Sequence, residues 1–306
     1  MKKNCDFIIS DEKIHTAKPL FIISKNSPFL SIPFSKEDFI IKAFLNKKNG
    51  DDGAIIDDWC FSKDLFFENV HFKREWFSLE QIATKAMLVN ISDAISMNAV
   101  PKYALLGLAL PKNLSENEIK ALQKGFLKTA RKFNIKIIGG DTISNDKIDI
   151  SLTIISKIND KAVFRKGLKK GHLLAYTGKL GRSLKGLEIL QNGGTLKPNH
   201  VFIKPKLRAS FFYEIAPLIS CAMDISDGLS KDLSRLLALN KCGISWFKKL
   251  DDYALYSGEE YEILFAFDEK ERQNIEIIAK KHGVKLNIFG KAVKGKYEFR
   301  GREHHF

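Results

Sequence analysis

The hydrophobic and polar positions follow a helical period in some segments of the chain and the two-residue period of a strand in others. Apolar residues at intervals of three and four predict amphipathic helices, and Ser78 with Gln81 and Ser115 with Glu118 have the spacing of capping boxes. Short apolar runs between turn residues predict strands. The helices are predicted at residues 35–45, 78–97, 115–133, 229–239 and 269–282. The strands are predicted at residues 7–10, 21–24, 54–56, 59–67, 103–111, 135–142, 148–156 and 284–288.

This order of segments predicts an α+β fold in two halves, each a mixed sheet with helices on one side. The chain has 306 residues, which is enough for two domains of ordinary size. The first domain is predicted at residues 35–156 and the second at residues 157–306. Residues 1–34 precede this pattern as an N-terminal extension of unclear role.

Composition excludes several classes of protein. Hydrophobic residues make up 44% of the chain, so a globular core is expected, but the longest apolar run, residues 103–111, is too short for a membrane span. The first residues lack the apolar core of a signal peptide, so a cytoplasmic protein is expected. The four cysteines are scattered without a CxxC pair, which argues against a zinc site or a disulfide framework.

The clearest chemistry lies in AMDISDGLSKDL, residues 222–233. Its apolar start predicts a strand end that carries Asp224, Ser226 and Asp227 into a glycine turn before a helix. Two carboxylates beside such a turn suit a divalent cation held against a phosphate, because Mg²⁺ prefers oxygen ligands. A helix N-terminus capped by Ser226 or Asp227 is the simpler alternative for this stretch alone.

Other acidic residues also lie at turns and strand positions rather than in charge runs. Asp51 and Asp52 lie between two glycines, and Asp64 lies in the middle of a predicted strand. Asp93 lies on the apolar stripe of its helix, and Asp141 follows two glycines. Each has a structural alternative, such as a turn, a solvated position or a buried hydrogen bond. Together they predict a carboxylate-rich basin for several Mg²⁺ ions and a polyphosphate, since close carboxylates repel one another without cations.

Two further positions and one turn have both functional and structural interpretations. Arg165 is a candidate phosphate partner. His71 lies between Val70 and Phe72, which is more typical of a core histidine than of a ligand. The turn at residues 177–183 precedes a predicted helix whose N-terminus could bind an anion, although no Walker A sequence occurs in the chain.

Six segments that contain these residues resemble, in the same order along the chain, the motifs of bacterial thiamine-monophosphate kinase. This family belongs to the superfamily of aminoimidazole ribonucleotide synthetase and selenophosphate synthetase. The resemblance runs from about residue 35 to the C-terminus. It implies the two-domain aminoimidazole ribonucleotide synthetase-like fold and a homodimer that pairs N-terminal domains. It also implies ATP-dependent phosphorylation of thiamine phosphate to thiamine diphosphate. The similar segments are NGDDGA, SKDLFFENVHF, VNISDAISMNAVP, GGDT, MDISDGLSKDL and SGEEYEILF.

The resemblance also implies residue roles by motif position, with several Mg²⁺ ions per site and ATP as co-substrate. No catalytic base is implied, because the phosphate of thiamine phosphate is already anionic at neutral pH, and transfer depends on positioning and charge neutralisation. The implied metal ligands are Asp52, Ser62, Asp64, Asp93, Asp141, Asp224 and Asp227. The implied ATP contacts are Gly140, Arg165 and Ser226. The implied contacts to thiamine phosphate are His71 and Glu259.

The chain departs from the family pattern near the acceptor end of the site. Lys63 stands where the family usually has Thr, and Glu260 stands where it has Asp in a G-E-D-Y pattern. An aromatic residue expected near the C-terminus is replaced by Glu303 or His304. These departures affect the prediction of thiamine recognition more than that of ATP and Mg²⁺ binding.

Two other functions fit parts of the pattern. Another ATP-using member of the superfamily would keep the aspartate motifs and differ at His71, Glu259 and the C-terminal tail. A non-catalytic nucleotide- or nucleic-acid-binding protein would account for the net charge of +14. Lysines are spread along the whole chain without a dense basic arm, however, so neither nucleic acid nor a membrane is expected as a partner.

Overall fold

The computed structural model describes residues 36–44, 46–297 and 299. The chain divides into two compact units, one ending at Ala43 and one beginning at Phe44. In the first unit, helix α1 spans Lys36–Ala43, where the sequence predicts a helix. The strands predicted at 7–10 and 21–24, the first residue of the helix predicted at 35–45, and the tail residues Glu303 and His304 lie outside the described residues.

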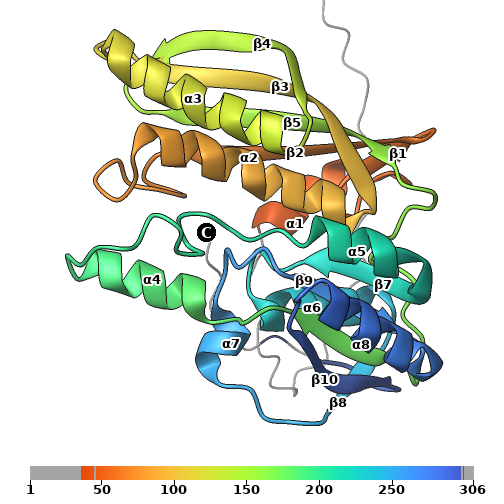
Figure 1. Cartoon of the computed structure of the whole chain (residues 1–306). Helices are drawn as coiled ribbons and strands as arrows, with labels where there is room; N and C mark the ends of the chain where they lie inside the picture. Colours follow the sequence, from red (N-terminus) through yellow and green to blue (C-terminus); the bar gives the residue numbers. More distant parts are fainter. Residues whose placement is uncertain (1–35, 45, 298, 300–306) are drawn as a thin grey trace, which may run out of the picture. The chain divides into compact units, whose positions relative to one another are not determined.

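The second unit begins with a five-stranded mixed sheet in the order β1-β2-β5-β3-β4 (Figure 1). Strands β3 and β4 pair in parallel and the other neighbours pair antiparallel. The predicted strands at 54–56 and 59–67 match β1 and β2 in both bounds. The strands are β1 (Ala54–Ile56), β2 (Trp59–Phe67), β3 (Ala99–Pro111), β4 (Lys136–Asn145) and β5 (Asp149–Ile158).

Two strands of this sheet are longer than the sequence pattern predicts. Strand β3 starts at Ala99 and includes Pro101, which lies next to a register shift where the regular ladder with β5 is interrupted. A proline is tolerated at such an irregularity because no ladder hydrogen bond is required there. Strand β4 does not end with the two glycines and the acid that follows them but continues to Asn145, because its pairing with β3 extends past these residues.

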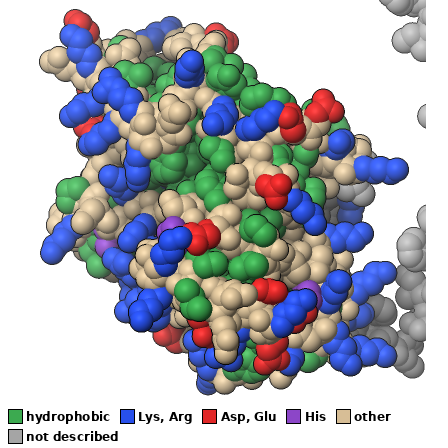
Figure 2. Space-filling view, turned by 45° about the vertical axis from the view of Figure 1, so that its right-hand side comes forward, with side chains coloured by type: hydrophobic (Ala, Val, Ile, Leu, Met, Phe, Trp, Pro, Cys, Tyr) green, Lys and Arg blue, Asp and Glu red, His purple; other side chains and the backbone are tan. Residues whose placement is uncertain are grey.

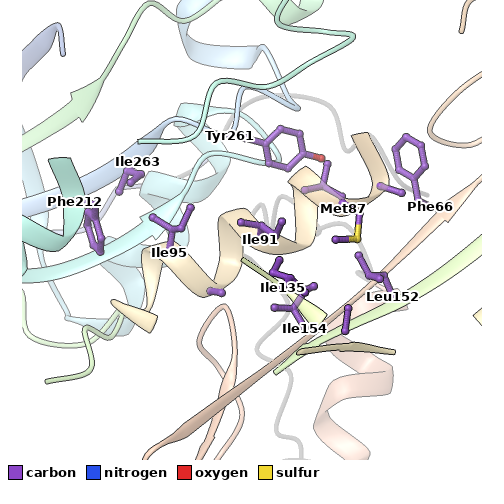
Figure 3. Close-up of a cluster of buried hydrophobic side chains, with 14 of the residues drawn as sticks. Phe66, Met87, Ile91, Ile95, Ile135, Leu152, Ile154, Phe212, Tyr261 and Ile263 are labelled. Carbon is purple, nitrogen blue, oxygen red and sulfur yellow. The ribbon is translucent and has the colours of Figure 1, made fainter. Parts of the chain in front are cut away.

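Two helices cover one face of the first sheet. Helices α2 (Leu79–Ser96) and α3 (Glu116–Lys132) start at Ser78 and Ser115, and both capping boxes predicted from the sequence are present. Helix α2 is buried around most of its circumference. Figure 3 shows why: Leu152 and Ile154 pack on one side of it, while Phe212 and Ile263 from the second half of the chain pack on the other.

The second half of the chain forms a five-stranded antiparallel sheet in the order β7-β9-β6-β10-β8. Helices α5 and α8 share a hydrophobic core with one face of this sheet, and α6 shares a separate core with the other. Strands β6 and β9 are therefore buried at every position, whereas the sequence predicts helices on one side of a mixed sheet. The elements are β6 (Leu173–Thr177), α4 (Arg182–Gln191), α5 (Ala209–Ile215), β7 (Ile219–Asp224), α6 (Leu229–Leu239), β8 (Gly243–Trp246), α7 (Asp252–Tyr256), β9 (Ile263–Phe267), α8 (Arg272–Lys281) and β10 (Leu286–Val293).

The surface agrees with the even spread of charge along the sequence. Figure 2 shows lysine and arginine side chains scattered over the face in view rather than gathered in a single basic patch. In the part of the chain that the structure describes, no helix combines the length and apolar character needed to cross a bilayer.

Candidate active site

Four of the predicted aspartates come together beside helix α2, and we call Asp52, Asp64, Asp93 and Asp224 the acidic cluster. Asp64 faces α2 because it pairs with Leu152, which lies on the buried face of the first sheet. Asp93 projects from α2 itself, and Asp224 is the last residue of β7. Asp52 comes from the turn before β1. Helix α2 therefore brings both halves of the chain to one site.

Asp64 and Asp93 are directly hydrogen-bonded to each other within the acidic cluster. Their carboxyl groups share a hydrogen bond, which requires one of them to carry a proton. Burial, together with the neighbouring charge of Asp52, raises the pKa of Asp64 to about 6. Burial and the charges of Asp64 and Asp224 raise the pKa of Asp93 well above its usual range. The side chains around the acidic cluster therefore do not fully compensate the negative charge of its carboxylates.

Asp52 is bound by a guanidinium group instead. Arg165 donates from Nε to Asp52 Oδ1 at 2.9 Å and from Nη2 to the same oxygen. Only 1% of the Asp52 side chain is exposed. The hydroxyl of Ser96 and the backbone N–H of Asp224 donate to its other oxygen, the latter at 3.2 Å. The backbone N–H of Arg165 donates to Asp51 at 2.7 Å, so both acids of the turn hold this arginine.

Asp224 lies at the end of β7 with 2% of its surface exposed. Its Oδ2 accepts a hydrogen bond from the Ser92 hydroxyl at 2.8 Å. Burial, followed by the charge of Asp52, raises the pKa of Asp224 well above its usual range. Ser92 lies one residue before Asp93 on α2, so this helix also orients the aspartate of the second half.

Asp227 follows Asp224 by three residues in the sequence but is not part of the acidic cluster. It forms ion pairs with basic residues of α6. Arg235 Nη1 lies 2.5 Å from Asp227 Oδ2, and Lys231 Nζ lies 3.5 Å from the same oxygen. Asp232, which the sequence interpretation missed, is fully buried and accepts from the backbone N–H of Asp227 at 3.1 Å. Burial and the charge of Asp227 raise the pKa of Asp232 to about 7.

Ser226 and Glu259 meet across two loops. The backbone N–H of Glu259 donates to the carbonyl oxygen of Ser226 at 2.7 Å. Glu259 Oε2 accepts a hydrogen bond from the ammonium of Lys85 on α2 at 3.1 Å. Lys85 is the second functional candidate that the sequence interpretation missed, although a lysine between Ala83 and Met87 on a strongly apolar helix is a signal for it.

Gly140 and Asp141 do not join the acidic cluster of their own chain. Asp141 pairs with Gly107, which pairs with Ser151, so it lies on the sheet face opposite to Asp64. Strands β2 and β4 are separated by three strand spacings of about 4.8 Å, or about 14 Å in all. At Gly140 a Cβ would lie 1.7 Å from the Leu106 carbonyl oxygen, so the glycine is required by close strand packing.

Comparison with known proteins identifies the family. Residues 50–158 match the model described as the N-terminal domain of AIR synthase related proteins. The thiamine-monophosphate kinase of Buchnera aphidicola subsp. Schizaphis graminum is 33% identical over 270 residues, which are 79% of this chain and 83% of that relative. The chain belongs to the thiamine-monophosphate kinase family. The resemblance found in the motifs and the enzyme class that it implies, thiamine-phosphate kinase, are both confirmed.

Solved structures support the same family and fold. The structure of AaThiL complexed with AMPPCP and TMP has a TM-score of 0.74 and 26% identity, and it covers 85% of this chain and 90% of that chain. The thiamine-monophosphate kinase of Stenotrophomonas maltophilia has a TM-score of 0.71 and 25% identity over 87% of this chain and 95% of that one. The hydrogenase maturation protein HypE of E. coli, at 19% identity and a TM-score of 0.67, covers 85% of this chain and 90% of that chain, and it shares the fold. The predicted α+β fold of the aminoimidazole ribonucleotide synthetase-like type is therefore confirmed.

Two of the thiamine-monophosphate kinase motif residues have structural contacts. The Ser62 hydroxyl donates to the side-chain oxygen of Asn90 at 2.5 Å and lies on the same strand face as Asp64. His71 Nδ1 accepts from the backbone N–H of Phe67 at 3.0 Å, which closes the turn after β2. The roles implied for Ser62 and His71 stay predictions.

The departures from the kinase pattern also have definite places. Lys63 points to the open face of the first sheet, where its ammonium lies 2.5 Å from the Ser151 hydroxyl. Glu260 accepts from the backbone N–H groups of Gly181 and Ser183 at 2.8 and 2.9 Å, and from the Ser257 hydroxyl at 2.6 Å. The N-terminus of α4, which the sequence offers as an anion site, is therefore filled by the protein's own carboxylate.

The acidic cluster suits the binding of Mg²⁺ by its donor chemistry. Its buried carboxylates have raised pKa values because they are desolvated and repel one another, and a cation relieves both effects. Within residues 36–44, 46–297 and 299, however, no three His, Cys, Asp or Glu side chains already surround one point as ligands. Asp52 in particular is held by Arg165, so its availability to a cation depends on that arginine.

Proposed function

We propose that the chain transfers the terminal phosphoryl group of ATP to thiamine phosphate in the cytoplasm, forming thiamine diphosphate and ADP. The observation that carries this proposal is the acidic cluster, which two halves of the chain build around α2 in a fold shared with AaThiL. That relative is complexed with AMPPCP, an ATP analogue, and with TMP. The membership of the family and the buried carboxylates support the same reaction from independent directions.

Asp64, Asp93 and Asp224 are the residues best placed to hold Mg²⁺, and Asp52 joins them when Arg165 releases it. Asp227 and Ser62 are included in the same proposal as further Mg²⁺ ligands. Bound Mg²⁺ would neutralise the charge of the phosphate groups and of the carboxylates that hold it. This accounts for buried carboxylates that the protein alone leaves poorly compensated.

The side chains themselves supply positioning. Arg165 is a permanent cation with several N–H donors beside the acidic cluster, so it is suited to take a phosphate of ATP in place of Asp52. Ser92 fixes one oxygen of Asp224, and the Ser226 backbone fixes the turn that carries Glu259. The acceptor phosphate is already anionic at neutral pH, so these residues need only align the two phosphates.

The proposal includes a homodimer that pairs the open faces of the first sheet. This face exposes large apolar side chains, with Leu65 50%, Leu105 37% and Ile143 60% exposed, which is typical of an interaction surface. Asp141 lies on this face, on the edge strand β4, and cannot reach the acidic cluster of its own chain. A second copy would bring Gly140 and Asp141 to the site in trans.

Product analysis tests the reaction directly. Purified protein with ATP, Mg²⁺ and thiamine phosphate should form thiamine diphosphate and ADP in equal amounts, and omission of Mg²⁺ should abolish both. Consumption of ATP only with a different phosphate acceptor would replace thiamine phosphate and keep the kinase site. The absence of any Mg²⁺-dependent ATP turnover would reject the proposed function.

A further inference from the structure

Lys85 is a lysine buried inside an aromatic enclosure. It lies on α2, and its side chain has no exposed surface. Its Nζ lies 4.1 Å from the ring centroid of Phe202, 5.3 Å from that of Phe77 and 5.9 Å from that of Phe66. The ammonium donates to Glu259 Oε2 at 3.1 Å, across 174 residues of sequence.

Stability alone does not account for this pair. Burial lowers the pKa of Lys85, and the charge of Glu259 acts in the opposite direction by favouring the ammonium form. An apolar side chain of similar volume would fill the same enclosure without a charge, and such replacements of buried ion pairs are often neutral or stabilising. The enclosure therefore points to a role for the ammonium itself.

Glu259 has one bonded and one unbonded carboxylate oxygen. Oε2 accepts from Lys85, whereas Oε1 is buried and has no hydrogen-bond partner among the residues that the structure describes. The backbone of Glu259 has φ of +52°, which is uncommon for a residue with a side chain and is held by the bond to Ser226. A buried acceptor without a partner, on a strained turn beside the site, is typical of a ligand contact.

We propose that Lys85 is a positioning residue that fixes Oε2 of Glu259, so that Oε1 accepts a hydrogen bond from an N–H donor of the acceptor substrate. This inference rests on the proposed function, in which the acceptor is thiamine phosphate. Lys85 and Asp93 lie on the same helix, so α2 sets the distance between the acceptor subsite and the acidic cluster. Lys85 touches neither phosphate nor metal and acts only through Glu259.

Kinetics of three variants test this proposal with the full chain. Lys85→Met removes the ammonium and keeps the length, Glu259→Gln removes the charge that it fixes, and the third variant carries both changes. Lys85→Met and Glu259→Gln should each raise the KM for thiamine phosphate by about tenfold or more, the usual effect of losing a charged hydrogen bond. The double variant should be no worse than the more affected single variant, because the two residues act as one unit. The KM for ATP should change by less than about threefold in all three.

Lys128→Met is the matched control. Lys128 is an exposed lysine on α3 that lies 3.0 Å from Glu80, so the same substitution there removes a surface ion pair. It should leave both KM values at those of the wild type. A purely structural role for Lys85 would lower the amount of folded protein or kcat without separating the two KM values, and that result would overturn the proposal.

A second measurement uses the wild-type protein, in case Lys85→Met does not fold. With ¹⁵N-labelled lysine, the solvent-protected ammonium signal of Lys85 should shift when thiamine phosphate is added and stay in place when AMPPCP alone is added. If the Lys85 ammonium signal of active enzyme does not shift when thiamine phosphate is added, the role of Lys85 is overturned and the proposed function is retained. Wild-type protein that neither binds nor phosphorylates thiamine phosphate would overturn both.

Discussion

Arg165 and Asp52 form a buried ion pair that joins the segment after β5 to the turn before β1, 113 residues apart in sequence. The guanidinium donates from Nε and Nη2 to one carboxylate oxygen, and Asp52 is almost completely shielded from water. The chain's own cation thus compensates an acid that belongs to the predicted metal and nucleotide site. In the proposed function, this pair joins a predicted ATP contact, Arg165, to a predicted Mg²⁺ ligand, Asp52.

Arg165→Met should therefore destabilise the protein in a way that Mg²⁺ partly reverses. Without Mg²⁺ the variant leaves the Asp52 carboxylate buried and unpaired, and the free energy of unfolding should fall by about 3 kcal/mol. Mg²⁺ binding to the released carboxylate should recover part of that loss, since a ligand of the folded state stabilises it. Urea unfolding with EDTA and with Mg²⁺ measures both effects.

Arg208→Met is the control for this prediction. Arg208 forms a similar buried pair with Glu262, at 2.5 Å, but Glu262 is bonded to Thr177 instead of joining the acidic cluster. This variant should lose a comparable free energy of unfolding, and Mg²⁺ should restore no more of it than it adds to the wild type. Equal recovery in both variants would show that Asp52 has no special relation to Mg²⁺.

Asp64 should make the metal-free protein less stable as pH rises. Its folded-state pKa of about 6 lies above the ordinary value of 3.8, so the folded state holds the proton more tightly than the unfolded state does. Its contribution to stability is therefore present below about pH 4, declines between about pH 4 and pH 6, and is absent above that range. Asp64→Asn removes this dependence and should be more stable than the wild type above pH 6, by about 1–3 kcal/mol.

Urea unfolding in EDTA across that pH range measures this effect. Asp141→Asn, which changes an exposed aspartate of the same sheet, should leave the free energy of unfolding within about 0.5 kcal/mol of the wild type. At pH 8, Mg²⁺ should stabilise the wild type more than Asp64→Asn, and the variant should be inactive. An Asp64→Asn protein that is no more stable than the wild type at pH 8 in EDTA would contradict the destabilising effect assigned to the charged Asp64 carboxylate.

Glu260 should matter for stability more than for turnover. Its carboxylate accepts two backbone N–H groups at the N-terminus of α4 and is 3% exposed. Glu260→Met removes the acceptor oxygens and leaves these buried N–H groups without a hydrogen bond, so the free energy of unfolding should fall by about 1–3 kcal/mol, while kcat should stay within about twofold. Thermal unfolding and steady-state kinetics measure the two quantities. A large loss of kcat with unchanged stability would instead place Glu260 in the substrate site.

Local signals in the sequence predicted the first half of the fold closely. The caps of α2 and α3 depend on residues three apart, and the bounds of β2 depend on its own alternation, so short-range patterns were sufficient. Strand β4 was predicted to end at the two glycines and the acid that follows them, because the local apolar run stops there. Its hydrogen bonds to β3 continue past that point, and pairing with another strand is not visible in the local pattern.

The candidate site shows the same division. The aspartates could be predicted because they occur in compact motifs, but their partners could not. Lys85 is hydrogen-bonded to Glu259 across 174 residues of sequence, and Arg165 to Asp52 across 113 residues. Contacts between residues so far apart leave no short-range pattern in the sequence from which they could be predicted. Asp232 was not singled out from the sequence, because its complete burial follows from the packing of α6.

Asp224→Asn and Asp227→Asn should nearly abolish turnover while the far-ultraviolet circular dichroism stays that of the wild type. Each change keeps the size of the side chain but removes a charge that Mg²⁺ binding requires. Asp251→Asn is the control, because Asp251 caps α7 at the Ala254 N–H and asparagine caps a helix equally well. It should leave kcat unchanged. Wild-type rates in Asp224→Asn and Asp227→Asn would remove the metal assignment.

Mixing two inactive variants should restore activity if Asp141 acts across a homodimer. Asp64→Asn and Asp141→Asn are each expected to be inactive alone. In a mixed dimer, one site combines the intact Asp64 of one copy with the intact Asp141 of the other, whereas the second site has lost both residues. Random exchange of equal amounts makes half of the dimers mixed, so turnover should recover to about a quarter of the wild-type value.

The control for this mixing experiment pairs Asp64→Asn with Asp93→Asn. Both residues lie in the acidic cluster of one chain, so the two changes fall at different sites of a mixed dimer and every site stays defective. Mixing them should restore nothing. Recovery confined to the pair with Asp141→Asn would show that β4 serves the partner's site, because about 14 Å and the thickness of the sheet separate Asp141 from Asp64 within one chain. No recovery in either mixture, from protein shown to exchange subunits, would mean that Asp141 has no part in a site completed by the second copy.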